Sequence, residues 1–133
     1  MTAVVALALG SAPTAAPAAP AADGTTTFNA HGSGGESSGS ISWFNRSVTV
    51  QGSVTDFAGG WGTTQVIFEF WQGNPLSDDS ATKIDTQTRS VSGGQRSFNF
   101  PQNAPSGGIT DIFYYVCNST QSACGEVELT ERP

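Results

Sequence analysis

Residues 109–117 read ITDIFYYVC and residues 64–71 read TQVIFEFW. Side chains in both segments alternate with a period of two, which is the period of a β-strand. In the second segment Val66, Phe68 and Phe70 fall on one face and Ile67, Glu69 and Trp71 on the other. This pattern predicts a central strand for residues 64–71, and residues 109–117 carry the strongest strand signal in the chain.

Four further segments show the same alternation. They are residues 47–54, with Val48, Val50 and Val54 on one face; residues 82–91, near an edge with Ile84 inward; residues 96–100, with Phe98 and Phe100 together; and residues 125–130, with Val127 and Leu129 inside and Glu126 and Glu128 outside. Gly52 within the first of these segments suggests a bulge. The turn-rich spacing of six strands, with a seventh over Thr25–Phe28, predicts an all-β fold. The expected architecture is an immunoglobulin-like or fibronectin-like β-sandwich, and a small barrel is the alternative.

Length and charge bound the function. The chain has 133 residues, enough for one domain, and a net charge of -6 from 11 acidic and 5 basic residues. An acidic surface with few cations argues against nucleic acid and against anionic membranes as partners. No segment approaches the roughly 20 apolar residues that a membrane-spanning helix requires.

The first 22 residues predict export. A short apolar run at residues 3–9 and an Ala/Pro-rich stretch at residues 12–22 resemble a signal segment cleaved before Asp23, so we expect a secreted protein. No Lys or Arg precedes the apolar run, which places the true start upstream or makes Met1 a late start. A disordered tail is the alternative. The predicted organisation is an export signal at residues 1–22, a flexible arm at residues 23–40 and a sandwich domain at residues 41–133.

Cys117 and Cys124 are the only cysteines, and they flank a short loop between two predicted strands. Facing positions of an antiparallel hairpin bring Cβ atoms close enough for a disulfide. A metal site would need further ligands, and the sole histidine, His31, is distant in sequence. We therefore predict a structural Cys117–Cys124 disulfide in an oxidising compartment.

The sequence does not predict an enzyme or a cofactor. A nucleophilic triad needs a histidine beside its nucleophile, and His31 lies in the predicted arm. Glu69 and Asp111 are conceivable paired carboxylates, although an outward glutamate on a strand usually belongs to the solvated face. The Asp78-Asp79 pair suggests either a calcium loop of no established pattern or, more simply, a solvated turn.

Two aromatic residues are the candidate partner contacts. Phe28 is the one anchor in the predicted arm, and the threonines before it favour an extended backbone that a partner sheet can accept as an added strand. Residues 25–28 as a built-in first strand, or an arm that is only a spacer, are the alternatives. Trp61 lies between two glycines in a turn, where an exposed ring would suit a protein partner or a sugar. Of Trp43 and Trp71, at least one is expected in the core.

Three short segments carry a resemblance to a known group: SWFNRSV at residues 42–48, YVC at residues 115–117, and CG at residues 124–125 before the last strand. They resemble small secreted actinobacterial proteins, some of which are adaptor subunits of umbrella toxin particles. The resemblance implies a lectin-like subunit as the partner and docking through an extended N-terminal segment.

We therefore expect a secreted, non-catalytic interaction module that docks through its N-terminal arm and a sheet edge, with an adaptor in an extracellular toxin assembly as the specific form. A carbohydrate-binding domain that uses exposed tryptophans is the first alternative. A secreted inhibitor or antimicrobial effector is the second.

Overall fold

The computed structural model describes residues 21–57, 62–118 and 123–133. Within these ranges the chain forms nine strands and no helix, so none of the described segments is a helix able to cross a membrane. The strands are β1 (Gly24–Gly32), β2 (Gly35–Trp43), β3 (Ser47–Asp56), β4 (Thr64–Gln72), β5 (Thr82–Val91), β6 (Gly94–Asn103), β7 (Asp111–Asn118), β8 (Ala123–Cys124) and β9 (Glu128–Glu131).

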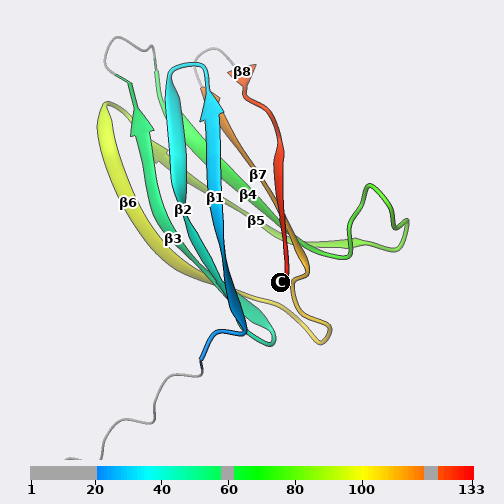
Figure 1. Ribbon diagram of the computed structural model, residues 1–133. Helices are drawn as coiled ribbons and strands as arrows, with labels where there is room; N and C mark the ends of the chain where they lie inside the picture. Colours follow the sequence, from blue (N-terminus) through cyan, green and yellow to red (C-terminus); the bar gives the residue numbers. More distant parts are fainter. Residues whose placement is uncertain (1–20, 58–61, 119–122) are drawn as a thin grey trace, which may run out of the picture.

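The strands form two antiparallel sheets that pack face to face (Figure 1). Sheet I has the order β1-β2-β3-β6, and sheet II has the order β5-β4-β7, with β8 and then β9 paired to the far side of β7. The chain changes sheet between β3 and β4, between β5 and β6, and between β6 and β7. The predicted all-β sandwich is confirmed. The possible seventh strand over Thr25–Phe28 is part of β1, at the edge of sheet I, and β2 is a strand that the sequence pattern did not predict.

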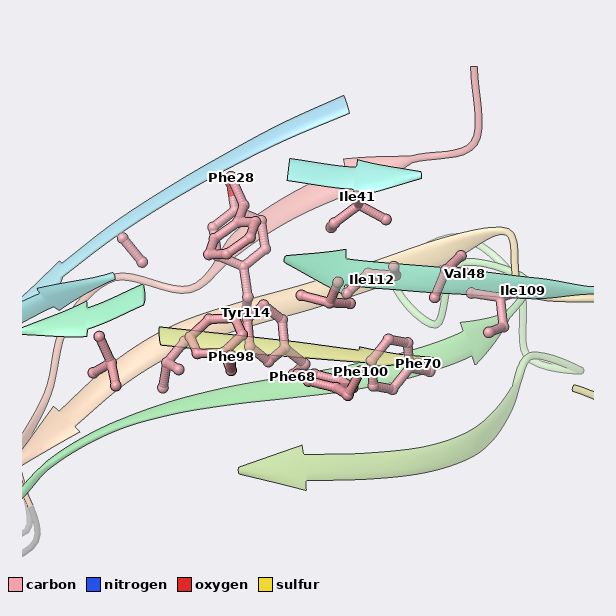
Figure 2. Close-up of a cluster of buried hydrophobic side chains, with 14 of the residues drawn as sticks. Phe28, Ile41, Val48, Phe68, Phe70, Phe98, Phe100, Ile109, Ile112 and Tyr114 are labelled. Atoms are coloured by element: carbon pink, nitrogen blue, oxygen red, sulfur yellow. The ribbon is translucent and has the colours of Figure 1, made fainter. Parts of the chain in front are cut away.

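The central position of β4 follows from its composition. Val66, Phe68 and Phe70 are fully buried between the sheets, and β4 pairs with β5 on one side and β7 on the other. The ring of Phe68 lies at the middle of an aromatic cluster, with centroids 5.8 Å from Phe100 and 5.9 Å from Phe98 (Figure 2). Edge-to-face packing of such rings adds to the free energy gained from their burial.

The predicted flexible arm at residues 23–40 is wrong, because residues 24–32 and 35–43 form β1 and β2 of the sandwich. The sandwich domain therefore begins near residue 24 and not near residue 41. Composition concealed this, since Gly and Ser are poor strand formers in isolation. Residues 1–20 of the predicted export signal lie outside the described residues.

A glycine pair explains how so polar a segment joins the core. Phe28, Gly39, Gly52 and Phe98 lie side by side across sheet I. A Cβ on Gly39 or Gly52 would approach the Phe28 ring to 2.8 or 2.7 Å, so the ring occupies the space that both glycines leave open. The rings of Phe28 and Phe98 stack across the gap at 6.2 Å. The expected bulge at Gly52 is absent: the pairing of β3 is continuous there, and the irregularity of the described strands lies at Phe70/Trp71.

The Cys117–Cys124 disulfide is confirmed. The two residues are direct partners in the β7–β8 pair, with Cα atoms 3.9 Å apart. Beyond it, a Cβ on Gly125 would lie 1.8 Å from the carbonyl oxygen of His31 in β1. The disulfide therefore fixes β8 to the end of β7. The residue after β8, Gly125, packs closely against β1, the edge strand of sheet I.

Replacing both cysteines by serine is expected to lower the free energy of unfolding by about 2.5 kcal/mol, because the bond closes a short loop and restricts the unfolded chain. Urea unfolding followed by tryptophan fluorescence measures the difference. Alkylation of the thiols only after reduction, detected by intact mass, is the accompanying check. Free thiols in freshly purified oxidised protein would contradict the assignment.

Candidate binding groove on sheet II

An apolar groove of about 430 Å³ lies on the outer face of sheet II. It is formed by side chains of β4, β7, the β4–β5 loop and the C-terminal segment: Glu69, Trp71, Pro75, Leu76, Phe113, Val127 and Leu129. Leu76 is 80% exposed and Val127 is 56% exposed. Exposed aliphatic side chains gathered around a hollow are typical of an interaction site.

The pairing of β9 creates this surface. The sequence pattern predicted Val127 and Leu129 inside the sandwich, and this prediction is wrong. Leu129 pairs with Phe113, which also lines the groove, and paired residues of neighbouring strands share one face. Thr130, one residue further, is the buried one.

Glu69 is the charged group of the groove. Its Oε2 accepts a hydrogen bond of 3.0 Å from the hydroxyl of Tyr115, and its Oε1 lies 3.8 Å from the Nζ of Lys83. Burial and the neighbouring carboxylate raise the pKa of Tyr115, which keeps the hydroxyl a donor. Lys83 also lies over the Trp71 ring, with Nζ 5.8 Å from its centroid. The indole nitrogen of Trp71 is buried and has no hydrogen-bond partner among the described residues.

The β4–β5 loop projects from one side of the sandwich (Figure 1). Its residue Leu76 lines the groove. Its conformation is held by hydrogen bonds: the Gly73 N–H donates to Thr110 Oγ1 at 2.8 Å, and the Leu76 N–H donates to Asn74 Oδ1 at 2.9 Å. An exposed apolar side chain on a loop held in this way binds at a lower entropic cost than one on a free loop.

The Asp78-Asp79 pair belongs to the same loop. One oxygen of Asp78 accepts hydrogen bonds from the hydroxyl and the N–H of Ser80, and these bonds hold the pKa of Asp78 below its ordinary value. This arrangement is a turn closed by an aspartate. Within the described ranges, no cluster of three or more His, Cys, Asp or Glu side chains is placed to hold a metal ion.

The two predicted partner contacts have different outcomes. Phe28 is wrong as a contact, because its side chain is 2% exposed and packs between the sheets. Trp61 lies outside the described residues. Trp43 is fully buried, as expected for one tryptophan, and Trp71 lines the groove. Of the two carboxylates considered for catalysis, Glu69 lines the groove and Asp111 does not.

Three of the edge strands carry features that hinder strand addition. Pro101 in the edge strand β6 has no N–H group. An edge strand tolerates this, but a strand added beside β6 would lack one backbone hydrogen bond there. The edge strand β5 carries charged side chains and pairs with β4 through a bulge, and β9 has only four residues. Charges, bulges and short strands are the devices by which edges avoid further pairing. The edges formed by β5, β6 and β9 are therefore poor sites for an added strand, and β1 is the remaining edge of sheet I.

No protein-family model and no curated protein matches the chain. Two solved structures are similar to it at 10% identity: β-glucuronidase 2 of Bacteroides uniformis, bound covalently to cyclophellitol-6-carboxylate aziridine, with a TM-score of 0.45, and a β-glucosidase of Kluyveromyces marxianus, with a TM-score of 0.37. Each alignment covers 81% of this chain but only 12% and 14% of the respective enzyme. A likeness at this level does not extend to a function.

Proposed function

We propose that the protein is a secreted, non-catalytic module that binds a protein partner through the apolar groove on sheet II. The observation that carries the proposal is the exposure of Leu76 and Val127 on either side of a hollow lined by aromatic rings. Burial of this aliphatic surface by a partner contributes a binding free energy of about 25 cal/mol per Å². Such contacts stabilise a complex most where they lie at the centre of the interface. The disulfide supports an oxidising, extracellular setting.

The charges around the groove support one kind of partner. Glu69 lines the groove. Glu131 lies in β9, at the edge of sheet II, on the same face as Leu129. The one described cation beside Glu69 is Lys83, whose side chain is 47% exposed. The partner is therefore a protein segment with an apolar anchor for the groove and a basic side chain for Glu69.

The resemblance to umbrella toxin adaptors makes the lectin-like subunit of such a particle the specific partner to test. In this form of the proposal the face of sheet II replaces the N-terminal arm as the docking element, since residues 24–40 belong to the sandwich. The adaptor then presents a preformed surface and does not order a segment on binding.

The test uses a double variant, Leu76→Asp with Val127→Asp. Both side chains are exposed, so the substitutions leave folding stability within about 0.5 kcal/mol. Wild-type protein on a resin captures partners from the culture supernatant of the producing organism, and mass spectrometry identifies them. Each captured protein is then purified and titrated against both forms by calorimetry. The expected result is a loss of affinity on the order of 100-fold in the double variant.

Phe57→Asp is the matched control, because Phe57 is 44% exposed and does not line the groove. It should bind as the wild type does. Equal binding by the groove variant would contradict the proposal. Loss of binding in the Phe57 control alone would move the contact to Phe57 and contradict the groove as the docking site.

A further inference from the structure

The outer face of sheet I has a chemistry unlike that of the rest of the molecule. Four strands place their outward residues in register, in rows that run across the sheet. The rows are Thr25-Ser42-Thr49-Pro101, Thr27-Ser40-Gln51-Asn99, Asn29-Ser38-Ser53-Ser97 and His31-Glu36-Thr55-Gln95. All but Pro101, His31 and Glu36 are neutral side chains that carry a hydroxyl or an amide.

The two ionisable residues of this face lie together at one end. His31 Nδ1 lies 3.3 Å from Glu36 Oε2, and both belong to the last row. The other three rows therefore contain no charged side chain at all.

A hollow of about 490 Å³ lies within these rows, along β3 and β6. Its lining consists of Gln51, Gly52, Ser53, Gln95, Ser97, Phe98 and Asn99. Gln95 Nε2 donates to Ser53 Oγ at 2.9 Å. The side chains of Gln51, Ser97 and Asn99 make no hydrogen bond within the described chain, so their donors and acceptors point to solvent or to a ligand.

We propose that this hollow binds a neutral polysaccharide. An ionic ligand would lose hydration without meeting an opposite charge, and an apolar ligand would leave amides and hydroxyls unpaired. Sugar hydroxyls both donate and accept hydrogen bonds, as do the hydroxyl and amide groups of the lining. A protein partner is disfavoured, because protein interfaces are rich in aromatic and arginine side chains and this face has none among its outward residues.

The neighbouring rows explain why the ligand is a polymer. They repeat the same hydroxyl and amide chemistry beside the hollow, so adjacent sugar units find equivalent contacts. Several weak contacts along one chain raise the overall affinity above that of a single unit. The apolar groove lies on the opposite side of the sandwich, on sheet II, so this inference stands independently of the protein partner proposed above.

Native affinity electrophoresis tests the proposal. The probes are laminarin, galactomannan and soluble starch as neutral polysaccharides, with alginate and heparin as anionic ones. At least one neutral probe should retard the wild-type protein. The variant Gln51→Ala with Asn99→Ala should raise its dissociation constant about tenfold, because two hydrogen-bonding amides are removed. Both residues are exposed, so the melting temperature should remain that of the wild type.

Thr86→Ala with Thr88→Ala is the control, since these exposed hydroxyls lie on β5 of sheet II. It should be retarded as the wild type is. The proposal is overturned if none of the neutral probes retards the wild-type protein, or if only the anionic probes do. It is also overturned if the Gln51 and Asn99 variant is retarded as strongly as the wild type. Self-association in size-exclusion chromatography that this variant abolishes would assign the face to a second copy of the chain, which also overturns it.

Discussion

Replacing Phe28 by alanine is expected to lower the free energy of unfolding by about 4 kcal/mol. The side chain is 2% exposed, and its ring lies 5.2 Å from Phe68 and 5.7 Å from Tyr114 (Figure 2). The cavity would be hard to refill, because the facing positions are Gly39 and Gly52, which have no side chains to move into it. A loss of this size is a large share of the 5–15 kcal/mol that holds a typical domain folded.

Urea unfolding of the purified oxidised protein measures the Phe28 effect. Phe57→Ala is the matched control, because Phe57 is 44% exposed and its removal should cost less than about 1 kcal/mol. A similarly small effect at Phe28 would mean that residues 24–32 are not part of the folded sandwich. The flexible-arm interpretation would then return, with Phe28 as a free anchor.

Replacing Arg132 by alanine is expected to cost about 3 kcal/mol, through the loss of two hydrogen bonds to a charged group. Its Nε donates to the carbonyl of Ile109 at 2.9 Å, and its Nη1 donates to the carbonyl of Phe44 at 2.8 Å. The guanidinium also lies 5.2 Å from the centre of the buried Trp43 ring and 3.9 Å from Asp23 Oδ2. One side chain thereby joins the C-terminal segment to the β2–β3 turn and to the segment before β7.

Arg96→Ala is the control for Arg132, because Arg96 is exposed and donates one side-chain hydrogen bond, of 3.2 Å, to the carbonyl of Ser90. It should change the free energy of unfolding by less than about 0.5 kcal/mol. Arg132→Lys should fall between the two, since an ammonium group cannot reproduce the forked geometry of a guanidinium. Equal stability of the Arg132 and Arg96 alanine variants would show that the C-terminal segment is not held in this way.

The two outer faces of the sandwich differ in a manner that suits two ligands. Sheet II presents an apolar groove with Glu69 inside it, and sheet I presents neutral hydroxyl and amide side chains. The same core supports both, because residues at alternate positions of each strand point into it and leave the others outside. Variants of one face should therefore leave the ligand of the other face bound, and the two proposed experiments can fail separately.

The sequence by itself determined the all-β fold, the central strand β4 and the disulfide. These features depend on local pattern: Val66, Phe68 and Phe70 alternate strictly, and Cys117 and Cys124 flank a loop too short to bring them anywhere but opposite each other. The edge position of β5 followed from its polar composition in the same way. An alternating pattern of this kind is sufficient to identify a strand from sequence.

Only the tertiary structure decided where the N-terminal strands and the groove lie. Residues 24–43 have a weak local signal, and they become strands because Phe28 fills the space beside two glycines that belong to other strands. Both faces of β7 are apolar. The sequence therefore did not show whether Leu129, in the neighbouring strand β9, would face the core or the outer surface. Register against Phe113 turned Leu129 outward, and a register shift of one residue exchanges the two faces completely. Leu76 adds to the groove from a loop whose position depends on Thr110, far away in sequence.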